Sequence, residues 1–248
     1  MNNYYDLKLN NWQLYALKEV GSTMDEIKKD CYKNNLNTLL MAYTQSAGRG
    51  RKNNKWISNL GNLFISIKLN TFYIPDAFLL NYLTGIVIYD TINSFLEEKK
   101  NIFIKWPNDL LVDKKKIAGI LIDTYSKGSK ISDLYIGIGI NMKIAPINLE
   151  YPTTCLKYES SLNLSRKKIL RKLIFYFNYW ESILKAKSIS YILRSWMKRS
   201  IPINSEISFI TKEGITNGIY KGINLNGSIK ILINNKESNF FNLDTVEQ

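Results

Sequence analysis

Two glycines alternate with two arginines in the stretch 45–56, which reads Gln-Ser-Ala-Gly-Arg-Gly-Arg-Lys-Asn-Asn-Lys-Trp. The glycines lack a β-carbon, so the backbone can turn sharply there and approach a ligand closely. The arginines carry planar donors that match a carboxylate or a phosphate, and the closing tryptophan offers a face for stacking. These residues are Gly48, Arg49, Gly50, Arg51 and Trp56. The stretch predicts a loop that closes over an anion, although a flexible basic loop has the same composition.

Polar side chains also follow a bend in the stretch 102–112, Ile-Phe-Ile-Lys-Trp-Pro-Asn-Asp-Leu-Leu-Val. Pro107 cannot donate to a β-ladder and forces the chain to bend, so Asn108 and Asp109 are presented between two apolar segments. Lys116 stands just before the next apolar run, and a rigid strand end is a good place for a catalytic cation. An ordinary turn and a solvated lysine run are the simpler interpretations of these residues.

Alternating glycines mark a third stretch, 134–142, which reads Leu-Tyr-Ile-Gly-Ile-Gly-Ile-Asn-Met. Gly137 and Gly139 share one face of the expected strand, because successive side chains point to opposite faces. Asn141 lies on the same face. A bare face admits a ligand, but it equally admits close packing of a neighbouring element.

Hydrophobic periodicity predicts the elements that position these stretches. Strands are expected over residues 12–20, 39–44, 62–69, 102–112 (with a bend), 117–122 and 134–142. Helices are expected from Ser22 or Thr23 through Lys33, from Pro75 to Leu96, from Ser165 to about Lys187, and over 189–199. After Pro202 the sequence changes to short β runs with Asn and Gly turns, which predict a small barrel. We therefore expect a larger domain over 1–200 and a small one over 201–248.

Composition excludes several classes of protein. The 248 residues include no histidine, which excludes a Ser-His-Asp triad and any His-ligated metal. Cys31 and Cys155 lack a paired-ligand spacing, so free thiols in a reducing compartment are the simplest account. No signal peptide and no apolar run of about 20 residues is present, which predicts a cytoplasmic protein away from membranes. The net charge of +13 favours anionic partners, although a lysine-rich composition would produce much of it.

Five stretches together resemble the biotin–protein ligases and occur in that family's order over about half of the chain. They are Gly21-Ser22-Thr23, 45–56, 105–110, 116–121 and 137–141. The resemblance implies an α+β fold with a mixed sheet and helices, akin to class II aminoacyl-tRNA synthetases and the biotinyl/lipoyl ligases, followed by a small C-terminal SH3-like β-barrel. It also implies the short form without an N-terminal DNA-binding domain or operator binding, since only about twenty residues precede the first motif.

The implied activity is that of a biotin–[acetyl-CoA-carboxylase] ligase. Such an enzyme converts biotin and ATP into biotinyl-5′-AMP and transfers biotin to a lysine of a biotin carboxyl carrier domain. The resemblance gives catalytic roles to Arg51, Lys116 and Asp109, with Lys116 on the carboxylate and the acyl phosphate, Arg51 on the adenylate, and Asp109 on the incoming lysine.

The binding residues follow from the same resemblance. The expected biotin site comprises Ser22, Thr23, Gln45, Gly48, Arg49, Arg51, Lys116, Gly137 and Gly139. The expected nucleotide site comprises Arg49, Arg51, Trp56, Asn108 and Asn141. Mg²⁺ is expected on the ATP phosphates, without assigned ligands, and the oligomeric state, a homodimer included, is left open.

The chain departs from the family pattern in two places. Lys52-Asn53-Asn54 stands where Arg-Gly-Arg is usual, which predicts a less permissive loop tip, and Met24 replaces a common asparagine. A lipoate–protein ligase on the same fold is the close alternative, but that family lacks the Gly-Arg-Gly-Arg loop. A basic nucleic-acid-binding module is the alternative of a different class. It predicts salt-sensitive binding and no use for the other motifs.

Overall fold

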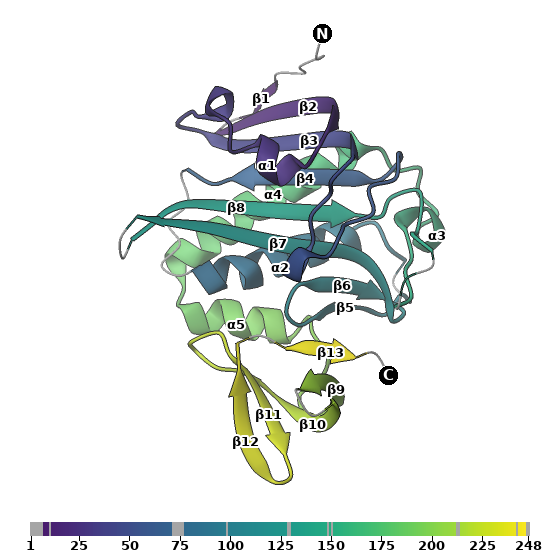
Figure 1. Cartoon of the computed structure of the whole chain (residues 1–248), viewed down its shortest axis with the longest axis vertical. Helices are drawn as coiled ribbons and strands as arrows, with labels where there is room; N and C mark the ends of the chain where they lie inside the picture. Colours follow the sequence, from purple (N-terminus) through teal and green to yellow (C-terminus); the bar gives the residue numbers. More distant parts are fainter. Residues whose placement is uncertain are drawn as a thin grey trace.

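The structure, a computed structural model, contains a larger mixed sheet and a smaller antiparallel sheet (Figure 1). It describes residues 7–9, 11–70, 77–97, 99–127, 130–147, 149, 151–211, 214–241 and 243–246. Among these residues, none of the helices combines the length and the apolar character that crossing a bilayer requires.

The larger sheet has eight strands in the order β1-β2-β3-β4-β8-β7-β6-β5. The strands are β1 Leu7–Leu9, β2 Trp12–Val20, β3 Asn37–Gln45, β4 Leu63–Lys68, β5 Ile102–Lys105, β6 Asp109–Val112, β7 Lys115–Lys127 and β8 Lys130–Ile140. The pair β2–β3 is parallel and the other neighbouring pairs are antiparallel. This confirms the predicted mixed sheet and the predicted bend, which separates β5 from β6.

The two faces of the sheet are covered differently. The longer helices, α2 Ala77–Asn93 and α4 Arg166–Ala186, lie behind the sheet in Figure 1, and the short α1 Thr23–Glu26 lies in front of it. Alternation along β8 explains the division, because its isoleucines belong to the core that α2 covers, whereas Gly137 faces Met24 of α1 and Gly139 faces Trp56. The site therefore has to lie on the glycine face.

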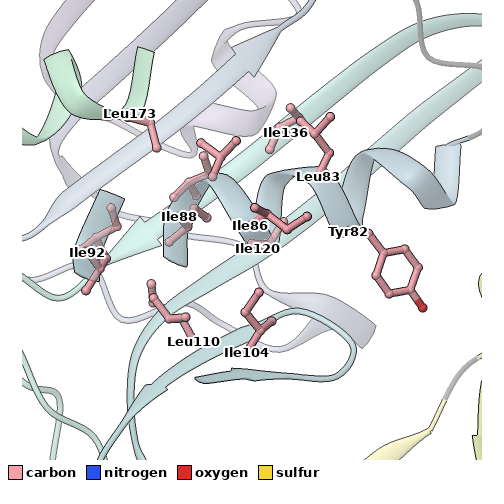
Figure 2. Close-up of a cluster of buried hydrophobic side chains, with 14 of the residues drawn as sticks. Tyr82, Leu83, Ile86, Ile88, Ile92, Ile104, Leu110, Ile120, Ile136 and Leu173 are labelled. Carbon is pink, nitrogen blue, oxygen red and sulfur yellow. The ribbon is translucent and has the colours of Figure 1, made fainter. Parts of the chain in front are cut away.

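The core behind the sheet combines many aliphatic side chains with several aromatic ones. Figure 2 shows side chains of α2 packed against side chains from the strands and from α4. The labelled members are Tyr82, Leu83, Ile86, Ile88, Ile92, Ile104, Leu110, Ile120, Ile136 and Leu173. Helix α2 is apolar nearly all round because it also contacts α4 and α5, Ile189–Met197.

The predicted helix from Ser22 or Thr23 through Lys33 is wrong in length. Only α1 is α-helical, Ser22 is its N-cap without a side-chain cap bond, and a 3₁₀ turn follows at Asp30–Tyr32. Tyr32 explains the break, because its buried ring packs edge-on against Tyr15 of β2 at 4.9 Å and draws the chain back to the sheet. The helix that begins after Ser165 is confirmed, and the Ser165 hydroxyl accepts a bond from the Lys168 backbone N–H. Pro75 lies outside the described residues.

The smaller sheet is antiparallel in the order β12-β11-β10-β9-β13, consistent with the predicted SH3-like domain. Its strands are β9 Glu206–Thr211, β10 Gly214–Ile223, β11 Ile229–Ile233, β12 Lys236–Phe240 and β13 Asp244–Val246. Two bonds connect its surroundings to the larger domain: the Ile104 N–H of β5 donates to the Arg199 carbonyl, which lies between α5 and β9, and the Tyr82 hydroxyl of α2 donates to the Gly227 carbonyl, between β10 and β11. The domain division at residue 200 stays a prediction.

Candidate functional site

A cavity of about 570 Å³ opens on the glycine face of the larger sheet. Its wall combines the loop 45–56, the turn after β5, the start of β7 and the glycines of β8. Every predicted site residue except Gly48 and Asn141 lines it. Ile210 of β9 and Leu243, which immediately precedes β13, complete the wall and carry no sequence signal of a site. The motifs therefore converge on one cavity.

One end of the cavity is a network of neutral polar groups. The backbone N–H and the hydroxyl of Thr23 both donate to Gln45 Oε1, at 2.7 and 2.9 Å. Gln45 Nε2 donates to Ser58 Oγ at 2.9 Å, and Ser66 Oγ donates to Thr23 Oγ1 at 2.9 Å. The Ser22 hydroxyl is buried, and none of the described residues bonds to it. This end suits a neutral ligand group that both donates and accepts. Sequence reasoning missed Ser58 and Ser66, since isolated serines give no signal.

The floor is made of glycines on which two large side chains rest. A β-carbon at Gly139 would lie 2.3 Å from the Trp56 ring, and one at Gly119 would lie 2.8 Å from it. A β-carbon at Gly137 would lie 2.9 Å from Met24. In this structure, the close packing of Trp56 and Met24 on the sheet accounts for the glycines on this face. Within the part of the chain that the structure describes, the Trp56 Nε1–H is nevertheless buried without a hydrogen-bond partner, which is unusual for an indole that only fills space.

The other end of the cavity is charged. Lys116 Nζ lies 2.8 Å from Asp109 Oδ2, and Asp109 Oδ1 is buried with no hydrogen-bond partner among the described residues. Arg51 Nη1 donates to Asn108 Oδ1 at 3.1 Å, and Asn108 Nδ2 donates to the Ile120 carbonyl at 2.7 Å. Two cations and a carboxylate with an available oxygen therefore face one space, as neutralising an anionic reaction requires.

The turn that carries Asn108 is fixed from behind. Its Trp106–Pro107 peptide bond is cis, and Asn81 Nδ2 of α2 donates to the Pro107 carbonyl at 2.6 Å. Trp106 Nε1 donates to the Tyr82 hydroxyl at 3.0 Å, below the cavity. Hydrogen bonds with side chains of α2 therefore hold the turn in place.

Arg49 has partners different from those of Arg51. Its guanidinium lies 2.7 Å from Asp25 Oδ1 and 3.1 Å from Asp123 Oδ2. Burial is the largest single influence and lowers the pKa of Arg49, but these carboxylates together outweigh it and raise that pKa above its ordinary value. The pairs join the loop to α1 and β7 across the floor, and direct contact of Arg49 with a ligand stays a prediction.

The loop itself is closed by backbone bonds. The Gly50 N–H donates to the Asn54 carbonyl at 2.7 Å, and the Trp56 N–H donates to the Gly48 carbonyl at 2.9 Å. A β-carbon at Gly48 would lie 2.5 Å from the Trp56 carbonyl oxygen, so glycine is needed for the closure. The left-handed residue at the loop tip is Lys52, with φ 51°.

Asn141 lies beneath the charged end instead of lining the cavity. It is buried, and its Nδ2 donates to the Thr154 carbonyl at 3.1 Å and to the Lys116 carbonyl at 3.4 Å. Its nucleotide-binding role stays a prediction, whereas these contacts position the Lys116 backbone. Asn62 is a similar residue that the sequence did not reveal: its Oδ1 accepts bonds from three successive backbone N–H groups, beginning at Met142.

No group of three or more His, Cys, Asp or Glu side chains that could hold a metal occurs among the described residues.

Comparison with known proteins gives a consistent result. The biotin/lipoate A/B protein ligase family matches residues 18–141. The chain is similar to the biotin–[acetyl-CoA-carboxylase] ligase of Paracoccus denitrificans, at 26% identity over 77% of this chain and 82% of that protein. It is 30% identical to the bifunctional ligase/repressor BirA of Escherichia coli over 76% of this chain, and spans 60% of that protein's length. The structure of biotin protein ligase from Aquifex aeolicus in complex with biotin and ATP matches with a TM-score of 0.81 at 26% identity, over 95% of this chain and 99% of that one.

Proposed function

Because the chain belongs to the biotin/lipoate A/B protein ligase family, we propose that it is a biotin–protein ligase. It activates biotin with ATP to biotinyl-5′-AMP and transfers biotin to a lysine of a biotin carboxyl carrier domain. The observation that carries this proposal is the shared cavity, in which Arg51 and Lys116 face one end and the Thr23–Gln45 network faces the other.

The first step joins two anions, so it needs fixed positive charge. Attack of the biotin carboxylate on the α-phosphate forms an acyl phosphate bond and releases pyrophosphate. Two like unit charges about 4 Å apart repel by roughly 4 kcal/mol at an effective dielectric constant near 20. Lys116 offsets this repulsion beside the carboxylate and the forming acyl phosphate. Arg51, held by Asn108, retains the adenylate.

The second step needs a deprotonated amine. The carrier lysine attacks the acyl carbon, the amide bond forms, and AMP leaves with the electron pair of the broken bond. The chain has no histidine for proton transfer. Asp109 is the candidate to orient the amine or accept its proton, because its buried Oδ1 accepts no hydrogen bond from the residues that the structure describes.

Mg²⁺ fits this end of the cavity. It prefers oxygen ligands and is often held by one or two carboxylates together with substrate phosphates. Asp109 Oδ1 is such an oxygen, and the Asn108 amide is next to it in the chain. When bound, the ion would supply neutralisation of phosphate charge.

The polar end favours biotin over lipoate. The ureido ring of biotin carries N–H donors and a carbonyl acceptor, which match Gln45, Thr23 and the unpaired Ser22 hydroxyl. The dithiolane ring of lipoate offers no N–H or O–H donor. Lipoate would therefore leave the buried Ser22 hydroxyl, which has no partner among the described residues, unsatisfied at a cost of about 1–3 kcal/mol.

We place the reaction in the cytoplasm. Cys31 and Cys155 are both free thiols, which suits a reducing compartment. The remaining partner is the carrier domain, and the strongly basic chain suits an acidic one.

Mass spectrometry of a carrier domain incubated with the protein, biotin and ATP tests the proposal directly. We expect one added biotin per carrier, and ATP–pyrophosphate exchange that depends on biotin and is absent with lipoate. Lys116→Ala should abolish both while weak biotin binding remains, because the carboxylate loses its cation. Lys168→Ala, on the exposed face of α4, is the matched control. Normal turnover by Lys116→Ala would refute the assigned role.

A further inference from the structure

The ammonium group of Lys116 lies between two aromatic rings. Its Nζ is 5.3 Å from the centroid of the Trp56 ring and 4.9 Å from the centroid of the Tyr151 ring. Asp109 Oδ2 is the third neighbour, at 2.8 Å, and only 13% of the lysine side chain is exposed. The ammonium is therefore enclosed by two π-faces and one carboxylate.

Such an enclosure fixes a cation without occupying all its donors. A lysine ammonium has three N–H donors, and Asp109 needs one of them. Ring faces attract the charge through their quadrupole and supply no localised lone pair, unlike a second carboxylate. The remaining N–H donors can therefore turn to an incoming anion without first breaking another ion pair.

Backbone hydrogen bonds hold the segment that follows Tyr151 beside Lys116. The Lys116 N–H donates to the Pro152 carbonyl at 2.9 Å, and the Thr154 N–H donates to the Lys116 carbonyl at 3.0 Å. These bonds form a short parallel bridge beside the start of β7.

The segment that carries Tyr151 is anchored at Thr154 to the buried carboxylate of Glu159. The Thr154 hydroxyl donates to Glu159 Oε1 at 2.5 Å, and Lys100 Nζ lies 2.7 Å from Glu159 Oε2. The segment is therefore tied both to Lys116 and to α3, Leu156–Glu159, and it cannot shift without moving the lysine backbone.

We propose that Tyr151 is a positioning residue for the reaction: with Trp56 it holds the Lys116 ammonium at the charged end of the cavity through its aromatic face. The hydroxyl of Tyr151 is not required. The kinetic part of this inference rests on the proposed function, whereas the enclosure itself does not.

A spectroscopic measurement tests whether the two rings enclose the Lys116 ammonium, and it does not require the protein to be enzymatically active. Reductive methylation with ¹³C-formaldehyde keeps the lysine charge, and the Lys116 methyl resonance is assigned by its loss in Lys116→Arg. We expect a ring-current displacement that Tyr151→Phe retains and Tyr151→Leu reduces. Tyr158→Leu, an exposed tyrosine on α3, is the matched control and leaves the resonance in place. A Lys116 resonance unmoved by Tyr151→Leu would overturn the enclosure.

Single-turnover formation of biotinyl-AMP tests the consequence. Tyr151→Leu should lower the maximal rate by about 2- to 30-fold, the range that a lost cation–π contact implies. Its KM for biotin should change much less, and Tyr151→Phe should restore the rate. An equal loss in Tyr151→Phe, or a wild-type rate in Tyr151→Leu, would contradict the positioning role. A wild-type protein that forms no biotinyl-AMP would overturn the proposed function, and the resonance comparison would still decide whether the rings hold the ammonium.

Discussion

Arg49 and Arg51 are two positions apart, yet the fold gives them different surroundings. Arg49 pairs with the carboxylates of Asp25 and Asp123 and so acts between elements of this chain. Arg51 donates to the neutral amide of Asn108 at the charged end of the cavity. Identical side chains in one motif therefore have different partners: Arg49 ties the loop to α1 and β7, and Arg51 lies at the charged end of the cavity, where its role in holding a ligand stays a prediction.

Replacing Arg51 by alanine should loosen the adenylate more than it slows its formation. A hydrogen bond to a charged group contributes about 1.5–3 kcal/mol, which corresponds to release faster by about 10- to 150-fold. Rapid filtration, with biotinyl-AMP measured in the filtrate over time, gives the release rate. Arg171→Ala on the exposed face of α4 should behave as the wild type. Tighter retention by the Arg51 variant would count against the assignment.

The site residues that could be predicted are those within distinctive local patterns. Gly48 and Arg51 belong to a motif whose composition is unusual by itself. Ser58, Asn62 and Tyr151 could not be predicted, because each acts through a partner distant in the sequence and no periodicity marks it. Local sequence patterns therefore predicted the chemistry of these side chains, whereas they did not predict contacts between residues that are distant in the sequence.

At the scale of elements, alternation predicted the strands well because one face of each is buried. The predicted helix from Ser22 was too long. Its end depends on the packing of Tyr32 against Tyr15 of β2, a contact between separate elements that local sequence does not show. The alternating glycines of β8 were identified, but not the side chains that cover them. Only the folded loop reveals that Trp56 rests on Gly119 and Gly139.

Adding a methyl group to this floor should open the loop. In Gly139→Ala the new β-carbon would lie 2.3 Å from the Trp56 ring, so the ring has to leave the floor. Trypsin should then cut faster after Arg49 or Arg51, as followed by mass spectrometry of the fragments. Gly21→Ala is the control, since nothing lies within 4 Å of its new β-carbon. Equal cutting rates in the two variants would show that Trp56 does not fasten the loop.

At the scale of the whole molecule, the two sheets meet through α2. The Tyr82 hydroxyl donates to the Gly227 carbonyl at 2.6 Å and accepts from Trp106 Nε1 at 3.0 Å. One buried oxygen thus bridges the smaller sheet and the turn that presents Asn108. The sequence predicted both sheets, but a link of this kind depends on packing between distant segments.

Tyr82→Phe should weaken this link while keeping the ring. The Gly227 carbonyl and the Trp106 indole would both lose a partner in a buried place, and each loss costs about 1–3 kcal/mol. Urea unfolding measures the change in the free energy of unfolding, and Tyr158→Phe on the exposed face of α3 provides the comparison. Unchanged stability would mean that water or another group replaces the hydroxyl.

Tyr220 lies on β10 of the smaller sheet and gives the molecule a sensitivity to alkali. Burial raises the pKa of Tyr220 from 10.0 to about 12. Below pH 10 both states keep the phenol proton, so the free energy of unfolding does not depend on this group. Between these pKa values the unfolded chain loses the proton and the folded one keeps it, which favours unfolding.

The free energy of unfolding should therefore fall by about 1.4 kcal/mol for each pH unit within that window because of Tyr220 alone. Tyr82 adds a fall of the same sign, since burial raises its pKa as well. Urea titrations across the window should give a smaller pH slope for Tyr220→Phe than for the wild type. Equal slopes in Tyr220→Phe and the wild type would place the Tyr220 hydroxyl in contact with water, and the packing of β10 against the rest of the molecule would then need revision.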